Sequence, residues 1–143
     1  MDHVAIMKRS WGLLPKIISG EKICEARWYK SKRDPWNRVK PKDTIYFKNS
    51  AEPVSLVATV SKVFQYEIKN NNQARNIMNK HALYDLGTRQ VNLDILSYIN
   101  NKKYAIFVYF INVKKVKPFK IDKRGFGSMS AWISIKDIDK VRF

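Results

Sequence analysis

The sequence is short of cysteine, histidine and acidic residues, and these shortages exclude several classes of protein. Its 143 residues include one cysteine, Cys24, and only two histidines, His3 and His81. A lone cysteine excludes a disulfide framework within the chain, and so few Cys and His side chains exclude a Cys/His-rich zinc site. No run approaches the ~18 apolar residues that cross a bilayer. The first residues lack the order of a signal peptide. We therefore expect a cytoplasmic protein that binds no metal, cofactor or membrane.

The shortage of acidic residues leaves a large positive charge. Twenty-eight Lys and Arg stand against 12 Asp and Glu, which gives a net charge of +16 and a pI near 10.0. The charge is uneven, since residues 101–124 hold eight basic side chains and one acid. Such a field favours a polyanion, because each phosphate that is neutralised releases condensed counterions. Clustering indicates a binding face, whereas the alternative is plain solubility charge. We predict that a monomer binds nucleic acid, RNA rather than DNA.

Short β-branched and aromatic runs alternate with fewer helical segments. These runs predict strands over 4–7, 22–29, 43–47, 54–67, 104–113 and 131–135. Helical spacing predicts helices over 11–18, 69–82 and 91–99, the first with Ser10 as its N-cap and Gly20 just past its end. A basic extension, 114–124, continues the last long strand and breaks at Pro118. Because turns separate most strands, we expect one α+β domain over residues 1–143, with a mainly antiparallel β-barrel, a short early helix and a two-helix insertion before the last long strand.

Residues 20–27 place charges of both signs where a helix leads into a strand. The run Gly20-Glu21-Lys22-Ile23-Cys24-Glu25-Ala26-Arg27 matches the pattern G-x-K-x-x-E-x-R and so resembles the ASCH domain family, which has a PUA-like fold and is related to the YTH and EVE domains. The sequence DTIYF at 43–47 follows a proline–lysine turn, as in that family, with Lys42 where the usual glycine stands. The resemblance implies a PUA-like barrel with a cleft beside the first helix, and the polar side chains of the motif on the floor of that cleft.

The same resemblance implies two activities. Family members are thought to bind RNA or to process modified nucleosides, and one bacterial branch resembles an amidohydrolase of N4-acetylcytidine that uses a Thr, a Lys and a Glu. This chain has Glu25 at the threonine position. If the protein is an enzyme, the candidate catalytic residues are Lys22, Glu25 and Glu67. Cys24 lies one position away and is expected on the opposite face of the strand.

The motif also has a direct physical interpretation as a base pocket. Lys22 and Arg27 only donate hydrogen bonds, and an ionised Glu25 only accepts them. Together they match a nucleobase edge that presents both donors and acceptors. The predicted aromatic walls of this pocket are Trp11, Trp28 and Trp132, since bases stack on aromatic rings. The alternatives are an ion pair that only organises the mouth of the barrel, and tryptophans that only pack in the core.

Outside the motif, a basic loop and a lysine-rich strand carry the predicted phosphate contacts. The candidates are Lys8, Arg9, Lys30, Lys32, Arg33, Arg38, Lys114, Lys115 and Lys117. The alternative for the strand is a solvated edge whose lysines prevent unwanted pairing. Trp36, in the basic loop 30–42, either stacks on nucleic acid or caps the end of the barrel. The turn at 125–130 has glycines and hydroxyls but lacks the spacing of a nucleotide-binding loop.

Three functions fit these observations. The favoured one is an RNA-binding module that recognises a modified or flipped base in the cleft. The alternative is an enzyme acting on a modified nucleoside or on RNA, either an amidohydrolase of the N4-acetylcytidine type or a ribonuclease. The third is an interaction domain with no catalytic activity.

Overall fold

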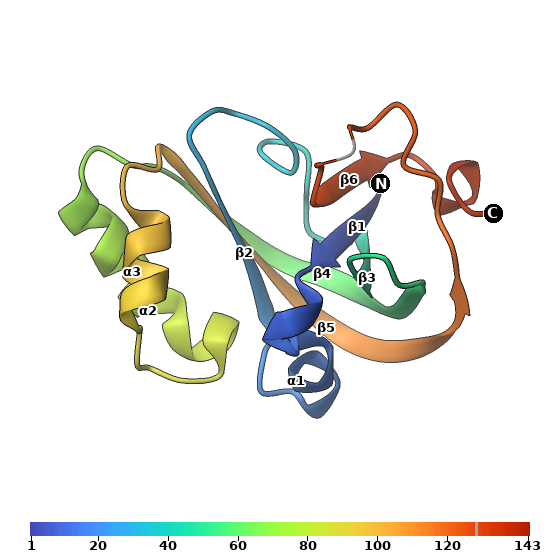
Figure 1. Cartoon of the computed structure of the whole chain (residues 1–143), viewed down its shortest axis with the longest axis horizontal. Helices are drawn as coiled ribbons and strands as arrows, with labels where there is room; N and C mark the ends of the chain where they lie inside the picture. The colour runs from blue at the N-terminus through green and yellow to red at the C-terminus, as the bar shows by residue number, and fades with distance from the viewer. Residues whose placement is uncertain (128) are drawn as a thin grey trace.

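The computed structural model of the protein describes residues 1–127 and 129–143, so Ser128 of the predicted 125–130 turn lies outside the described residues. Six strands, three α-helices and two short 3₁₀ helices are described (Figure 1). In chain order they are β1 (Asp2–Met7), η1 (Arg9–Trp11), α1 (Leu13–Ser19), β2 (Cys24–Tyr29), β3 (Thr44–Asn49), β4 (Val54–Glu67), α2 (Asn71–Leu86), α3 (Leu93–Ile99), β5 (Tyr104–Phe119), β6 (Trp132–Ile135) and η2 (Ile138–Lys140). None of the described helices is long and apolar enough to cross a membrane.

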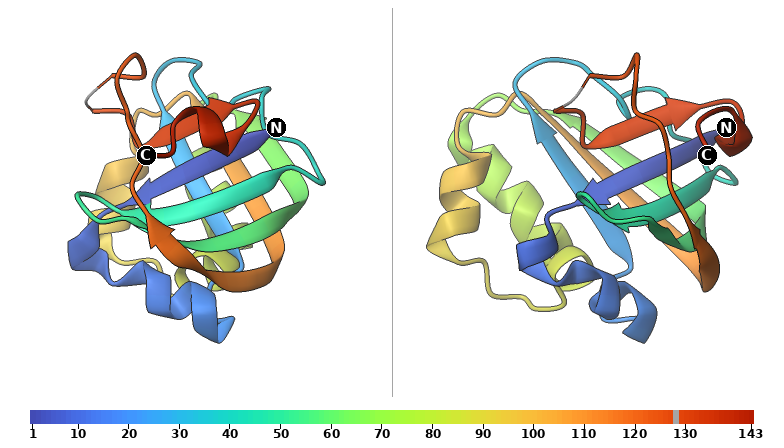
Figure 2. Two further views of the ribbon diagram at one scale, coloured as in Figure 1. Left: turned by 90° about the vertical axis from the view of Figure 1, so that its right-hand side faces the viewer. Right: turned by 45° about the vertical axis from the view of Figure 1, so that its right-hand side comes forward.

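The strands form one mixed sheet that curls into a half-barrel (Figure 2). Its order is β2-β5-β4-β3-β1-β6, and every neighbouring pair is antiparallel except β1 and β3, which are parallel. β2 and β6 are therefore the two edges. The helices α2 and α3 lie together against one side of the curled sheet, away from β6 and the C-terminus (Figure 1). The predicted mainly antiparallel α+β fold is confirmed.

Several predicted elements differ from the structure by a few residues at their ends, and two differ because of backbone geometry. The predicted helix 11–18 is divided by Gly12, whose φ of 59° ends η1 before α1 begins, so Ser10 lies inside η1 and is not an N-cap. Gly20 does end α1, with a φ of 84°. Pro118 does not break β5, which continues to Phe119 and pairs there with Val54. A register shift in β4 next to this pair accommodates the proline near the end of the strand.

Side chains of β5 alternate between two hydrophobic cores. One set packs inside the half-barrel and consists of Ile106, Val108 and Phe110. The other packs beneath α2 and α3 and consists of Ala105, Phe107 and Tyr109. Because successive side chains of a strand point to opposite faces, this apolar run covers both sides of the sheet. The same alternation in β2 sends Cys24 and Trp28 toward the helices, which leaves Glu25 and Arg27 on the other face.

A buried histidine anchors α2 to the sheet. His81 stacks on Phe107 with ring centroids 4.0 Å apart, and its two ring nitrogens meet the hydroxyls of Tyr66 at 2.9 Å and Tyr109 at 2.5 Å. Burial, and secondarily the positive charges of Lys80 and Lys62, lower the pKa of His81 from 6.5 to about 4. The imidazole is therefore neutral at pH 7, with one nitrogen donating and the other accepting.

This lowered pKa predicts that the protein loses stability in mild acid. As the pH is lowered from 6.5 to 4, His81 takes up a proton in the unfolded chain but not in the folded protein. The free energy of unfolding therefore decreases over this range, by up to about 3 kcal/mol. Urea unfolding at pH 7.5 and 4.5 measures this fall, which should be smaller in His81→Gln, because a glutamine does not titrate. An equal fall in both proteins would contradict the assignment. His3, whose pKa is also lowered by burial, remains in both.

Lys42 occupies a backbone conformation that favours glycine. Its φ is 77°, in the turn before β3 where the ASCH pattern has glycine, and its side chain is exposed. A left-handed conformation costs a non-glycine residue ~1–2 kcal/mol, and the greater freedom of unfolded glycine offsets part of this. We expect Lys42→Gly to raise the free energy of unfolding by about 0.5–1 kcal/mol in urea denaturation. The control Lys40→Gly, at a nearby exposed residue that has no positive φ, should lower it.

Candidate functional site

A cleft of about 850 Å³ lies between the N-terminal helical turns, β2 and the α2–α3 pair. Its floor includes Lys22, Glu25 and Arg27, the three charged residues of the motif. The wall opposite the first helix comes from residues 85–99, which belong to α2, α3 and the loop between them. The cleft is therefore bounded by the helical insertion as well as by the first helix and the barrel.

The ammonium of Lys22 is buried at the centre of the floor. The side chain is 2% exposed, and its Nζ donates to the backbone oxygen of Asp85 at 2.7 Å and to Asp85 Oδ1 at 2.5 Å. Glu25 Oε2 lies 3.3 Å from the same nitrogen. The left-handed Gly20 turns the chain out of α1, and the Lys22 N–H then donates to Lys16 O at 3.0 Å, so the backbone holds Lys22 in this position.

Burial and charge act in opposite directions on Lys22. Burial by itself would lower the pKa of this ammonium, but the carboxylates of Asp85 and Glu25 outweigh it and raise the pKa above its ordinary value. Lys22 therefore stays protonated at neutral pH and serves as a fixed positive charge and hydrogen-bond donor.

Arg27 continues this network to the other edge of the half-barrel. Its Nη2 lies 3.5 Å from Glu25 Oε1, and its guanidinium donates to the carbonyls of Ala131 at 3.1 Å and Ile6 at 3.4 Å. The floor is thus a row of alternating charges, in the order Asp85, Lys22, Glu25 and Arg27. Two of its buried atoms have no hydrogen-bond partner among the described residues: Glu25 Oε2, which only the ion pair with Lys22 reaches, and Arg27 Nε.

Removal of the Lys22 charge should destabilise the whole fold. Lys22→Met leaves Asp85 and Glu25 buried without their cation, and breaking a buried pair in this way costs ~3–5 kcal/mol. Urea denaturation should show this loss, whereas Lys80→Met, at an exposed site on α2, should change the free energy of unfolding by less than about 0.5 kcal/mol. Adding Asp85→Leu to Lys22→Met should recover part of the loss. A Lys22→Met protein as stable as wild type would contradict the role of the pair.

Asp85 is a site residue that the sequence analysis missed. It lies on the buried face of α2, seven residues after Met78 and three after Ala82. An acidic residue on the apolar face of a helix is uncommon, because a buried carboxylate needs a partner. That position was a usable signal, but nothing in it identified Lys22, 63 residues away, as the partner.

The predicted aromatic residues fall into two groups. Trp11 and Trp28 line the cleft; Trp11 is 59% exposed with Lys8 Nζ 5.4 Å from its ring, whereas Trp28 is nearly buried. Trp132 is 3% exposed, and its ring lies 5.3 Å beneath the Arg27 guanidinium. Trp36 is partly buried and packs edge-on against Tyr104 at 5.0 Å, at the end of the barrel. A further aromatic wall, Tyr98 of α3, was not predicted.

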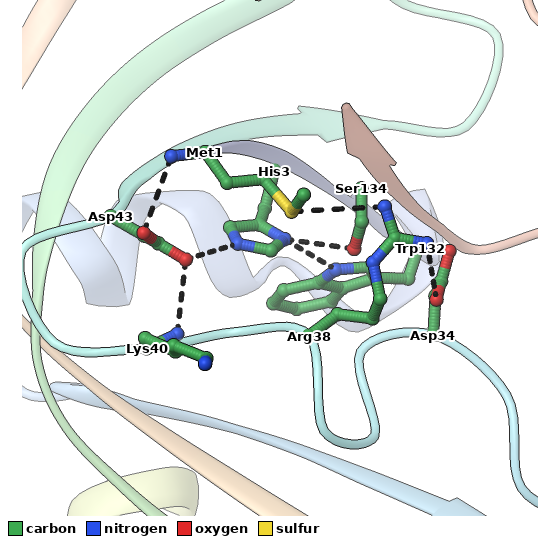
Figure 3. Close-up of polar contacts among 8 residues, drawn as sticks. All are labelled: Met1, His3, Asp34, Arg38, Lys40, Asp43, Trp132 and Ser134. Atoms are coloured by element: carbon green, nitrogen blue, oxygen red, sulfur yellow. Dashed lines mark hydrogen bonds and ion pairs between the residues drawn. The ribbon is translucent and has the colours of Figure 1, made fainter. Parts of the chain in front are cut away.

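Trp132 belongs to a polar network with His3, Asp43 and Ser134 (Figure 3). Its Nε1 donates to His3 Nδ1 at 3.3 Å, so that nitrogen carries no proton. His3 Nε2 then donates to Asp43 Oδ2 at 2.8 Å, and Ser134 Oγ donates to Nδ1 at 2.9 Å. The order Ser–His–Asp resembles a hydrolytic triad, but His3 and Ser134 are buried and do not line the cleft. The network joins β1, β6 and the turn before β3.

The predicted phosphate contacts occupy different surroundings. Lys8 lines the cleft, Arg9 pairs with Glu52 at 2.9 Å, and Arg38 pairs with Asp34 at 3.4 Å. The others are exposed, on the loop after β2 or on the distal half of β5; they are Lys30, Lys32, Arg33, Lys114, Lys115 and Lys117.

The remaining candidates lie outside the cleft. Glu67 is exposed at the end of β4 and is not among the lining residues. Cys24 is buried beneath the helices, on the opposite face from Glu25, and burial raises the pKa of its thiol well above its usual range. No group of three or more His, Cys, Asp or Glu in the described residues is arranged to hold a metal ion.

Solved structures with similar folds share little sequence with this chain. It is similar to the ASCH protein from Zymomonas mobilis, with a TM-score of 0.68 and 13% identity over 97% of this chain and 90% of that one. It is also similar to the N-terminal domain of McrB from Staphylothermus marinus, with a TM-score of 0.54 and 11% identity over 97% of this chain and 90% of that domain. No protein-family model and no curated protein matches the sequence. The ASCH, PUA-like fold that the motif predicted is therefore the fold of this chain.

Proposed function

We propose that this protein is an RNA-binding module that takes one base, modified or flipped out of its strand, into the cleft over Glu25 and Arg27. The observation that carries the proposal is that two atoms on the floor, Glu25 Oε2 and Arg27 Nε, make no hydrogen bond within the described residues, although Oε2 lies 3.3 Å from the Lys22 ammonium. One only accepts a hydrogen bond and the other only donates. A buried polar atom without a partner costs ~1–3 kcal/mol, so a ligand that completes both atoms binds favourably.

A nucleobase edge has the required chemistry. The carboxylate accepts from an exocyclic amine, as carboxylates do from cytosine N4, and the guanidinium donates to a neighbouring ring nitrogen or carbonyl. Trp11 offers an exposed ring at the mouth of the cleft, and stacking of a base on such a ring contributes ~1–3 kcal/mol.

The charges around the cleft also support an anionic ligand. Lys22 and Arg27 are balanced by Asp85 and Glu25, so the floor has no net charge. At the rim the lining residues Lys8, Lys16 and Lys123 outnumber the single carboxylate, Asp94. A neutral floor below a positive rim suits a base with its phosphates outside the cleft.

The enzyme alternative draws less support from this geometry. An amidohydrolase or a ribonuclease needs a group that accepts a proton from water or from a hydroxyl. Lys22 is held as an ammonium, and Glu67 lies outside the cleft. Glu25 is the one predicted catalytic residue that remains placed to act, and it is already paired with two cations.

A binding titration with a matched variant tests the proposal. The probe is a fluorescent single-stranded RNA of 12 mixed nucleotides. Glu25→Gln keeps the shape of the side chain but replaces one acceptor oxygen with a donor, so we expect Kd to rise about tenfold, within the ~1–3 kcal/mol of one base contact. Glu67→Gln makes the same change outside the cleft and should leave Kd unaltered.

Two further measurements serve as controls for the binding titration. Thermal unfolding of Glu25→Gln establishes that the variant is folded, and Trp11→Ala, at an exposed ring, removes the predicted stacking without disturbing the charged floor. Equal Kd values for wild type, Glu25→Gln and Trp11→Ala would sink the proposal, as would RNA that is cleaved during the titration.

A further inference from the structure

Two basic segments meet at the end of the cleft that lies beyond Tyr98. The N–H of Lys103 donates to Tyr29 O at 2.9 Å, which joins the start of β5 to the loop after β2. The joined segments carry the basic residues Lys30, Lys32, Arg33, Lys102 and Lys103. In the described part of the chain none of these five forms an ion pair with a carboxylate. The cluster is therefore an uncompensated positive surface.

The ring of Tyr98 connects this cluster to the cleft. Lys102 Nζ lies 4.7 Å from the ring of Tyr98, which lines the cleft and is 50% exposed. The Arg33 guanidinium lies 5.4 Å from the ring of Tyr29. Burial and then the charges of Lys30 and Arg33 lower the pKa of Lys102, as expected where cations crowd together without an anion.

The opposite end of the cleft has a similar pairing. Lys8 Nζ lies 5.4 Å from the ring of Trp11, and both residues line the cleft together with Lys16. The N-terminal helices lie near the beginning of β2, and the loop after β2 lies at its other end (Figure 1). At ~3.3 Å per residue, the six residues of β2 separate the two ends by about 17 Å.

We propose that the ligand of this cleft is a single-stranded polynucleotide, held by phosphates on both sides of the bound base, and not a free nucleoside or mononucleotide. The Lys8 end holds a phosphate on one side of the bound base, and the cluster around Arg33 and Lys102 holds a phosphate on the other side. Because the ends are about 17 Å apart, these two phosphates are separated by more than one nucleotide. A mononucleotide has phosphate on one side of its base and is shorter than the distance between the two ends. This inference rests on the proposed function and adds the class of ligand to it.

Salt-dependent binding tests the inference. The double variant Arg33→Ala/Lys102→Ala removes two charges from the cluster, and Lys136→Ala/Lys140→Ala removes two charges from exposed residues near the C-terminus, away from the cleft. Each phosphate contact to single-stranded nucleic acid contributes ~0.7 to the slope of log K against log salt. With the 12-nucleotide RNA, the cluster variant loses the one phosphate contact that this cluster makes, so its slope should fall by ~0.7 and that of the control variant by much less. Each of the four ribonucleoside monophosphates should bind at least about tenfold more weakly than the RNA, because it reaches one end only.

Two outcomes would overturn the inference: a cluster variant whose slope equals that of the control variant, or a monophosphate that binds as tightly as the RNA. Either can occur while Glu25→Gln still weakens binding, which leaves the base pocket intact and removes only the two-sided phosphate contact. Failure of wild type to bind any RNA overturns the proposed function itself, and this inference with it.

Discussion

The architecture of the cleft depends on the ion pairs that the buried Lys22 ammonium makes with two carboxylates. A charge in this position is strongly disfavoured unless it is paired and hydrogen-bonded. Its two carboxylates come from different parts of the fold, Glu25 from β2 and Asp85 from α2. Lys22 therefore fixes how the helical insertion lies against the barrel, and the wall of the cleft is set by the same contact that forms its floor.

The open seam of the half-barrel gives the cleft its location. Among the described strands β2 pairs only with β5, so no described strand lies along its other edge. An exposed strand edge invites pairing with another chain unless something covers or interrupts it. Here the Arg27 side chain reaches the carbonyls of Ile6 and Ala131 in place of a backbone ladder. The Arg27 side chain thus links β2 to the other side of the half-barrel and leaves space for the cleft beside β2. In a closed barrel a paired strand would fill that space.

The charges are arranged differently on the floor and at the rim of the cleft. Alternation along the floor cancels the net charge, and the buried side chains are held by one another, so the floor presents fixed donors and acceptors. The rim and the two ends are basic and more exposed. In nucleic-acid recognition, contacts to phosphates mainly position the ligand, whereas contacts to base edges discriminate among bases. Under the proposed function, the rim would make the contacts of the first kind and the floor those of the second, a short distance apart along β2.

Local patterns in the sequence were enough to predict the strands, the order of the helices and the position of the motif. Val54–Glu67 was predicted to its end residues because β-branched side chains continue through it, and residues 20–27 identified the fold because their spacing is local. Which residues meet at the cleft depends instead on how the elements pack together. Asp85 and Tyr98 reach it through the docking of α2 and α3, while Trp132 turns into the core below Arg27. Periodicity records which face of an element is buried, but it does not record which distant element covers that face, because that depends on contacts between residues far apart in the chain.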